Sequence, residues 1–470
     1  MSDNNSKYRI EYDALGPVNV PHGALYGAYT VRAIHNFKIS GRTAHPALLI
    51  AYLHTKRAAA TANVRAGVVE PAIGKLIVEA VDQLLAMSRE SWNRIFPLDP
   101  YQAGAGTSQN MNVNEVIANL ANHRVGKDFG VYFPVHPTDH VNRSQSTNDT
   151  YPTAMRLALI DISLAFIIEL VRLSRSFNQK AEQWRHLLKA GRTHLRDAVP
   201  ITLGQEFKAY SETIRKCMRI VRSARDLLRE LNIGGTAVGT GINVPKNYRY
   251  YVIDELQRLT GEKLTSASDL IEATQSQLPI ANFMAAMKLT AIEVSRISND
   301  LRLMSSGPVT GLGEISLPSV QPGSSIMPGK LNPSIPEMVN QVCFSIIGYE
   351  QTTAQAVMAG QLELNVMMPV MAYSALESAV IGTNAIKALT DRCVLGIEAH
   401  EKVLNGYFES TTQIATVLTP ELGYEKTAEL VKEALEKRES IIALVREKHL
   451  LDDRKIDELI DPKILIREAS

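Results

Sequence analysis

PTAMRLALIDISLAFIIELVRLSRSFNQKAEQWRHL, residues 152–187, is the stretch that decides the fold. It contains no glycine and no proline after Pro152, which suits a first-turn position of a helix. Apolar residues recur through it at helical spacing, namely Met155, Leu159, Ile162, Phe166, Leu170, Leu173 and Phe177. This pattern predicts one helix of ~35 residues, which would be ~50 Å long at 1.5 Å per residue.

The apolar part of this stretch, Ala154 to Leu173, is long enough to raise the question of a membrane span. It carries four charged residues, Arg156, Asp161, Glu169 and Arg172. We therefore interpret it as a buried helix of a soluble protein. The segment from Met1 to Arg9 is polar, so we expect no secretory signal.

Further long helical runs follow, at about 202–231, 280–304, 336–359 and 370–390. Several are apolar on more than one face, which is typical of helices buried in a large bundle. Short amphipathic runs come later, at about 424–437, 439–448 and 453–459. We predict a mainly all-α fold with three domains: a mixed, mostly helical domain at 1–142, a central long-helix bundle at 143–398 and a small helical domain at 399–470.

Composition excludes several classes of function. Fifty basic and 49 acidic residues leave a formal charge of +1, so we expect neither nucleic acid nor a membrane surface as a partner. The hydrophobic content of 45% is enough for a large core. Cys217, Cys343 and Cys393 show no paired spacing, which favours a reducing compartment and a cytoplasmic protein.

Five connectors between the helical runs are dense in small polar residues. They are residues 104–114, 142–149, 191–197, 234–243 and 323–332. Each one alone is explained by helix caps and turns, which favour the same residue types. Five in one chain, each with several hydrogen-bond donors, favour a binding site.

Glycine motifs in these connectors do not match nucleotide-binding loops. Gly104-Ala-Gly106 and Gly239-Thr-Gly241 lack the third glycine of a dinucleotide fingerprint. Residues 323–330 carry five residues between their glycines rather than four, and a leucine follows the lysine. We therefore exclude nucleotide binding and expect no cofactor.

His136 and His140 are four residues apart, a spacing that suits a metal ion on a helix. Pro137 lies between them and breaks a helix, and no third cysteine or histidine ligand is placed nearby. We therefore predict no metal site.

The connectors together supply a set rich in donors and poor in carboxylates, which suits an anionic substrate. Its members are Thr107, Ser146, Thr147, Asn148, Thr193, His194, Ser324, Ser325, Lys330 and Asn332. Removing a proton from a carbon next to a carboxylate creates a dianionic, enediolate-like species. Several fixed donors in a dry pocket stabilise such a species, and a lysine pairs with a second carboxylate.

Residues 323–332, GSSIMPGKLN, resemble the signature of the aspartase/fumarase superfamily. Segments 104–119, 139–149, 191–197 and 306–308 are similar to that family too, in its order, and the resemblance runs from about Arg9 to the C-terminus. It implies a three-domain fold whose long helices form the core of a homotetramer, with active sites shared between three subunits.

The resemblance also implies catalytic roles. Ser324 would be the general base, its alkoxide stabilised by loop N–H groups and by Lys330. Gly323 and Gly329 bracket the signature, so the segment would act as a lid. Thr107, Ser146, Thr147 and Ser325 would hold the carboxylate that becomes the enediolate. Lys330 and Asn332 would bind the other carboxylate.

The leaving group would lie among Asn148, Thr193 and His194, with His194 also counted as catalytic. Glu337 would orient or charge His194, although an acid in the first turn of a helix explains Glu337 equally well. The long helix beginning at Pro152 would separate Ser146 from His194 in one chain by tens of ångströms. Different subunits would therefore supply the two residues.

The identity of the leaving group depends on flanking segments. Residues 26–37, 204–210, 336–344 and 365–369 look more like the aspartase version, whereas residues 191–194 and 327–330 also occur in fumarases. Thr138 departs from the Asn common in the family's His-Pro-Asn-Asp segment, which weakens any carry-over of a secondary anion site.

We interpret the chain as an enzyme for the reversible deamination of L-aspartate to fumarate and ammonia. The alternatives are a class II fumarase that hydrates fumarate to L-malate and a non-catalytic structural relative. The presence of Ser324, Lys330 and Asn332 speaks against the non-catalytic alternative.

Overall fold

A computed structural model describes residues 7–323, 325–437 and 439–461. The described chain is mainly helical, as the sequence predicts, and divides into two compact units. The first unit comprises Met1–Ile167, Ile220–Leu289 and Phe344–Gly382. The second unit comprises Ile168–Arg219, Thr290–Cys343 and Thr383–Ser470. The three-domain division at residues 142 and 398 stays a prediction.

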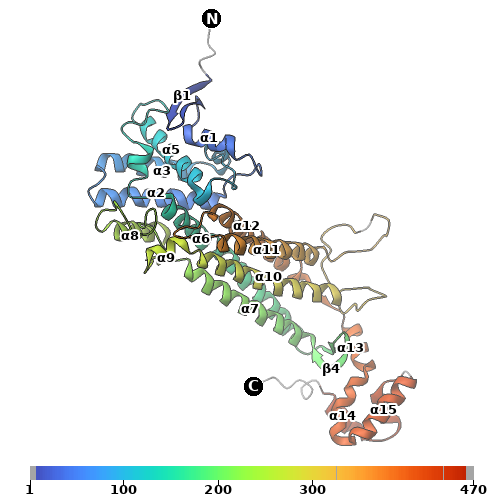
Figure 1. The fold of residues 1–470 in the computed structure, drawn as a ribbon. Coiled ribbons are helices and arrows are strands. Elements are labelled where there is room, and N and C mark those ends of the chain that lie inside the picture. Colours follow the sequence, from blue (N-terminus) through green and yellow to red (C-terminus); the bar gives the residue numbers. More distant parts are fainter. Residues whose placement is uncertain (1–6, 324, 438, 462–470) are drawn as a thin grey trace. The chain divides into compact units, whose positions relative to one another are not determined.

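Five long helices correspond to the five predicted runs (Figure 1). They are α6 (Thr147–Gln183), α7 (Leu203–Leu227), α10 (Leu278–Met304), α11 (Ser334–Met358) and α12 (Met368–Arg392). The boundary between the two units falls within each of them. Among the described residues, no helix is long and apolar enough to cross a membrane.

Helix α6 begins before the predicted start at Pro152, which lies inside the helix. Ser146 caps it: its hydroxyl accepts from the N–H of Asn148 at 3.2 Å, and its own N–H donates to Asp149 at 2.9 Å. Pro152 has no N–H for the carbonyl of Asn148. The side-chain amide of Asn232 donates to that carbonyl instead, at 3.1 Å. This tertiary contact lets the helix extend past the proline.

The predicted end of this helix at about Leu187 is also wrong, because α6 ends at Gln183. Beyond it, Leu203 and Gly204 at the start of α7 donate their N–H groups to the carbonyls of Leu187 at 2.9 Å and Trp184 at 3.1 Å. The chain between is the hairpin of β3 (Leu188–Thr193) and β4 (Arg196–Thr202), which the sequence analysis did not predict.

In the first unit, short helices surround α2 (Figure 1). Helix α2 (Pro46–Arg65) packs on α3 (Pro71–Ala86) and α8 (Tyr248–Thr260), and α3 packs on α5 (Thr107–His123). The remaining elements are β1 (Tyr8–Asp13), β2 (Gly16–Pro21), α1 (Ala28–Asn36), α4 (Arg89–Ile95), β5 (Glu230–Leu231), β6 (Thr265–Ser266) and α9 (Leu270–Gln275). Strands β1 and β2 pair antiparallel, whereas β5 and β6 pair parallel.

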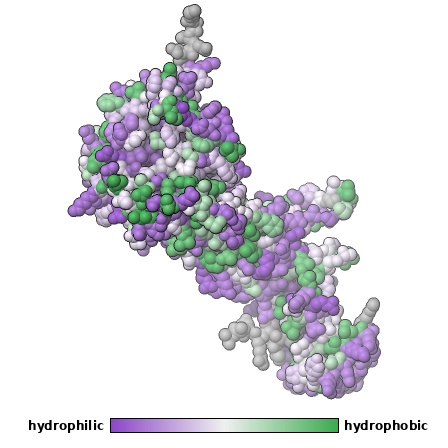
Figure 2. Space-filling view, viewed as in Figure 1, coloured by the Kyte–Doolittle hydropathy of each residue, from purple (hydrophilic) through white to green (hydrophobic). Residues whose placement is uncertain are grey.

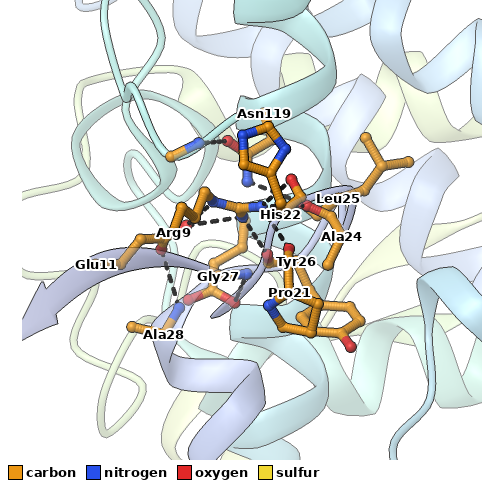
Figure 3. Close-up of polar contacts among 12 residues, drawn as sticks. Arg9, Glu11, Pro21, His22, Ala24, Leu25, Tyr26, Gly27, Ala28 and Asn119 are labelled. Carbon is orange, nitrogen blue, oxygen red and sulfur yellow. Dashed lines mark hydrogen bonds and ion pairs between the residues drawn. The ribbon is translucent and has the colours of Figure 1, made fainter. Parts of the chain in front are cut away.

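One arginine fixes the segment between β2 and α1 (Figure 3). The guanidinium of Arg9 donates at 2.7–3.0 Å to four backbone carbonyls, those of Pro21, His22, Ala24 and Tyr26. It also pairs with Glu11, whose carboxylate accepts from the N–H of Ala28 at the start of α1. Backbone groups that no sheet or helix satisfies are thus bonded to side chains.

In the second unit, a small antiparallel pair joins β7 (Ile315–Ser316) to β8 (Glu398–Ala399). The helices that follow are α13 (Glu401–Ser410), α14 (Ala415–Leu422), α15 (Tyr424–Lys437), α16 (Ile441–Glu447) and α17 (Asp453–Leu459). Leu418, Leu430, Leu444 and Ile456 are buried together among them. The last three helices confirm the runs predicted near the C-terminus.

Candidate active site

Two polar connectors meet in the first unit at the start of α6. The carboxylate of Asp149 accepts from the N–H groups of Gly234 at 3.0 Å and Thr236 at 2.9 Å. The side-chain amide of Asn148 donates to the carbonyl of Ala237 at 2.8 Å. Residues 142–149 and 234–243 are therefore held together by direct hydrogen bonds.

A third connector joins them through α5. Asn110 and Asn114 donate their amides to the side-chain oxygen of Asn142 at 3.1 and 3.2 Å. The hydroxyl of Thr150 donates to the side-chain oxygen of Asn110 at 3.3 Å. Thr150 lies one turn after the start of α6, and Asn110 lies one turn after the start of α5. The first turns of α5 and α6 therefore lie together. The connector 104–114 is itself mostly helical, because α5 begins at Thr107.

The turn before α5 depends on glycine. Ala105 and Gly106 are both left-handed, with φ of 57° and 82°. A Cβ on Gly106 would lie 1.9 Å from the buried ring of Tyr151. This close approach places Thr107, which is half-buried, in the first position of the helix.

Thr107 begins α5, while Ser146, Thr147 and Asn148 cap and begin α6. Thr147 is buried and the other three are half-buried. The N-terminus of a helix carries unpaired N–H groups and partial positive charge, which favour a carboxylate. The first unit thus brings together four predicted residues at two adjacent helix N-termini.

Lys56 is a buried lysine beside the connector 142–149, and it was not among the residues predicted from the sequence. Its amine donates to Asn142 at 3.0 Å and to Gln145 at 2.9 Å. Burial lowers the pKa of Lys56 to about 7, and burial raises the pKa of Asp149 to about 6. Lys56 lies in an alanine-rich helical run and carries no motif, so the sequence offered no signal for it.

Thr193 and His194 lie at the tip of the β3–β4 hairpin in the second unit, and both are exposed. His194 and Leu195 are left-handed, with φ of 54° and 56°. A tight hairpin turn requires such angles, and residues other than glycine adopt them at some strain. The hairpin therefore presents the imidazole to solvent on a sharply turned backbone.

The predicted signature forms an exposed loop in the second unit. Lys330 donates to the side-chain oxygen of Asn332 at 2.8 Å, and Ser325 is exposed. A Cβ on Gly323 would lie 1.4 Å from the carbonyl oxygen of Lys330, so the two ends of the loop touch through backbone atoms. Ser324, the predicted base, lies outside the described residues.

Glu337 lies in the first turn of α11 and is half-buried. Within the part of the chain that the structure describes, no ion pair joins it to His194. Its position matches the first-turn acid that the sequence also allowed.

The two histidines considered as metal ligands make local contacts. The Nδ1 atom of His136 accepts from the N–H groups of Thr138 and Asp139 at 3.3 and 3.2 Å. The Nδ1 atom of His140 accepts from the N–H of His136 at 2.9 Å. The described residues contain no cluster of three or more His, Cys, Asp or Glu side chains suited to a metal ion.

Comparison with known proteins shows similarity over nearly the whole chain. A family model described as Lyase matches residues 16–348, and one described as fumarase C C-terminus matches residues 414–467. The aspartate ammonia-lyase of Helicobacter pylori is 44% identical over 460 residues, which is 97% of this chain and 98% of that protein.

Two solved structures share the fold. The fumarate lyase:delta crystallin from Brucella melitensis superposes with a TM-score of 0.94 at 42% identity, covering 98% of this chain and 100% of that one. The class II fumarase from Schistosoma mansoni superposes with a TM-score of 0.91 at 33% identity, covering 97% and 98%. The similarity therefore extends to both units described above.

Proposed function

Because the chain belongs to the aspartase/fumarase superfamily of lyases, we propose that it catalyses the reversible deamination of L-aspartate to fumarate and ammonia. The 44% identity to an aspartate ammonia-lyase over 97% of the chain carries this proposal. It makes the protein a carbon–nitrogen lyase. The three free, buried cysteines fit a reducing compartment such as the cytoplasm.

The proposed reaction is an anti β-elimination. Ser324 removes a proton from Cβ of L-aspartate, and the electron pair moves into the adjacent carboxylate to form an enediolate. The intermediate then collapses to the carbon–carbon double bond of fumarate. The Cα–N bond breaks with its electron pair on nitrogen, so ammonia leaves, and the proton on Ser324 passes to solvent. Fixed donors around the dianion lower the barrier to the first step.

The group at the two helix N-termini would hold the carboxylate that becomes the enediolate. Thr107, Ser146 and Thr147 supply hydroxyls there, and the helix ends supply N–H groups. Ser325 would complete this subsite from the loop. Lys330 and Asn332, which bond to each other in the free loop, would turn to the other carboxylate when the loop closes.

The leaving amine would lie between Asn148 on one side and Thr193 and His194 on the other. His194 would exchange protons with it. Glu337 would orient that imidazole only if the hairpin and the start of α11 come together in the closed site.

One chain cannot supply all of these groups to one substrate. From Asn148 to Gln183, helix α6 rises ~52 Å at 1.5 Å per residue. The ten residues from Gln183 to Thr193 reach back at most ~36 Å when fully extended. Asn148 and Thr193 of one chain are thus at least ~16 Å apart, which is too far for a four-carbon substrate.

We therefore propose a homotetramer in which each site draws residues from three subunits. Large apolar side chains are exposed on four of the long helices, among them Leu164, Ile168, Ile220, Leu278, Leu289, Ile292, Leu303 and Phe344. Figure 2 shows hydrophobic residues among the hydrophilic ones on those long helices that face the viewer. Such faces favour packing against other copies of the same helices.

The runner-up function is hydration of fumarate to L-malate, which the similarity to a class II fumarase favours. Fumarate formation, followed by its ultraviolet absorbance, separates the two when aspartate and malate are supplied in parallel. We expect absorbance to rise with aspartate. A rise with malate alone would refute the ammonia-lyase proposal, and no rise with either would support the non-catalytic alternative.

A further inference from the structure

We infer that Glu314 is a positioning residue, whose buried carboxylate holds the β3–β4 hairpin so that Thr193 and His194 meet the leaving group. The inference rests on the proposed function and adds a residue to it. Glu314 lies in none of the polar connectors described above.

The carboxylate of Glu314 bonds two cations of the same strand. It accepts from Lys189 at 2.8 Å and from Arg192 at 2.6 Å. The side chain of Glu314 is fully buried and that of Lys189 is 3% exposed. Lys189 also donates to Glu206 on α7 at 2.6 Å, so the cluster contains two cations and two anions. Charge-assisted bonds in such a dry place are strong and directional.

The backbone of Glu314 is fixed independently of the hairpin. Its N–H donates to the carbonyl of Met304 at the end of α10, at 2.9 Å. Its carbonyl accepts from the N–H of His400 at 2.9 Å. The carboxylate of Glu314 is therefore held in a fixed position, and Lys189 and Arg192 of β3 bond to it there. The same segment leads into the loop at residues 323–332, which also carries predicted site residues.

Besides these ion pairs, the outer part of the hairpin is held by packing on α13, where the guanidinium of Arg192 lies over the ring of Tyr407 at 5.4 Å from its centroid. Leu188 and Ala190 are buried at its base, but residues 193–197 are exposed. A register shift between Ala190 and Arg192 interrupts the pairing, and an isolated two-stranded hairpin is only marginally stable. Arg192 directly precedes Thr193, so its ion pair with Glu314 fixes the position of the backbone just before Thr193 and His194.

A double-mutant cycle tests this role through the reaction. We expect Glu314→Gln to lower kcat by about 100-fold while KM changes little, because an error of ~1 Å in placement has that effect. In a His194→Ala background the same substitution should add no more than about 3-fold, since both changes act on one group. If the fold-loss in kcat of the double variant equals the product of the two single losses, the inference is overturned. Glu314→Asp, which keeps the charge, should recover part of kcat.

Glu262→Gln is the matched control. Glu262 likewise binds two cations, Arg225 and Arg229, but it belongs to the first unit. Its variant should keep kcat near that of the wild type. If Glu314→Gln fails to fold, Arg192→Gln leaves the pair between Lys189 and Glu314 intact and should give a smaller loss with the same lack of additivity.

Amide hydrogen exchange tests the anchor without any substrate. Peptides covering 188–202 should exchange faster in Glu314→Gln than in the wild type, whereas Glu262→Gln should leave them unchanged. Unchanged exchange in the hairpin of Glu314→Gln would overturn the inference. A wild-type protein that turned over neither aspartate nor malate would instead refute the proposed function, and the exchange result would still decide whether Glu314 holds the hairpin.

Discussion

The side-chain amide of Asn232 donates a hydrogen bond of 3.1 Å to the backbone carbonyl of Asn148. That carbonyl would normally accept from the N–H four residues later, where Pro152 has none. Asn232 is fully buried and also donates to Thr274 at 3.2 Å. It therefore completes the first turns of α6, on which Ser146, Thr147 and Asn148 depend.

Asn232→Asp should lower the stability of the protein by about 1–3 kcal/mol, because it removes a buried donor and places an acceptor against a carbonyl. It should also reduce kcat by displacing Asn148. Calorimetry and the aspartate assay measure the two effects. Asn178→Asp is the control, since Asn178 accepts from Lys208 in a solvent-exposed contact. Equal melting temperatures for the two variants would contradict the role of Asn232.

The pKa of Lys56 predicts how stability depends on pH. Burial lowers this pKa from 10.5 to about 7 in the folded protein. Between these values only the unfolded chain binds the proton, so the free energy of unfolding rises with pH through this window. From pH 8 to 9.5 the contribution of Lys56 should grow by about 2 kcal/mol.

The measurement is the melting temperature of the wild type minus that of Lys56→Met at each pH. This difference should increase from pH 8 to pH 9.5. Asp149 has a pKa of about 6 and has finished titrating by then. A constant difference would show that Lys56 does not lose its proton in the folded state.

Gly106→Ala should destabilise the protein more than a left-handed position alone explains. The left-handed backbone costs about 1–2 kcal/mol for a residue with a Cβ, and the overlap with Tyr151 adds about 1–3 kcal/mol. Gly126→Ala isolates the first effect, because Gly126 has φ of 80° and open space around it. Chemical denaturation compares the two, and similar losses would mean that Tyr151 moves aside freely.

Mixing two impaired variants tests the sharing of sites between subunits. Ser146→Ala and His194→Ala should each retain only a small residual activity alone. After they are dissociated together and re-assembled, about a quarter of the sites should contain both native residues, because the two residues come from different chains of a symmetric oligomer. No regained activity in re-assembled mixtures would argue for sites within single chains.

Ser324→Ala should lower kcat by about 100- to 10,000-fold, the usual range for a lost general base. Ser410→Ala is the control, because the exposed hydroxyl of Ser410 donates to the carbonyl of Gly406 one turn earlier in α13. The aspartate assay measures both. A Ser324→Ala variant with more than a tenth of wild-type kcat would remove Ser324 from the role of base.

Much of the fold could be read from local pattern. Apolar spacing and the absence of glycine predicted the long helices, because these features act within a few turns of one another. The start of α10 was predicted within two residues, and α17 matches its predicted run. The polar connectors were recognised for the same reason, since hydroxyl and amide residues cluster locally in each.

The site groups could be predicted only in part. Thr107 and the residues at the start of α6 are brought together by Asn110 and Asn142, which lie in polar connectors but were given no role, and by Thr150. Lys56 and Glu314 lie in stretches of sequence that match no motif. Their importance becomes visible only in the structure, where both side chains are buried. The hairpin carrying His194 was missed because its turn contains no glycine at the left-handed positions.

The sequence by itself determined the mainly helical architecture and the chemistry of the connectors, because periodicity and residue type are local properties. Only the tertiary structure decided where α6 begins and ends and what holds its neighbours. Its first turns need a donor from Asn232, and the carbonyls after its last turn bond N–H groups of α7. These partners are distant along the chain, and a helix end is set by whichever group satisfies its unpaired backbone atoms.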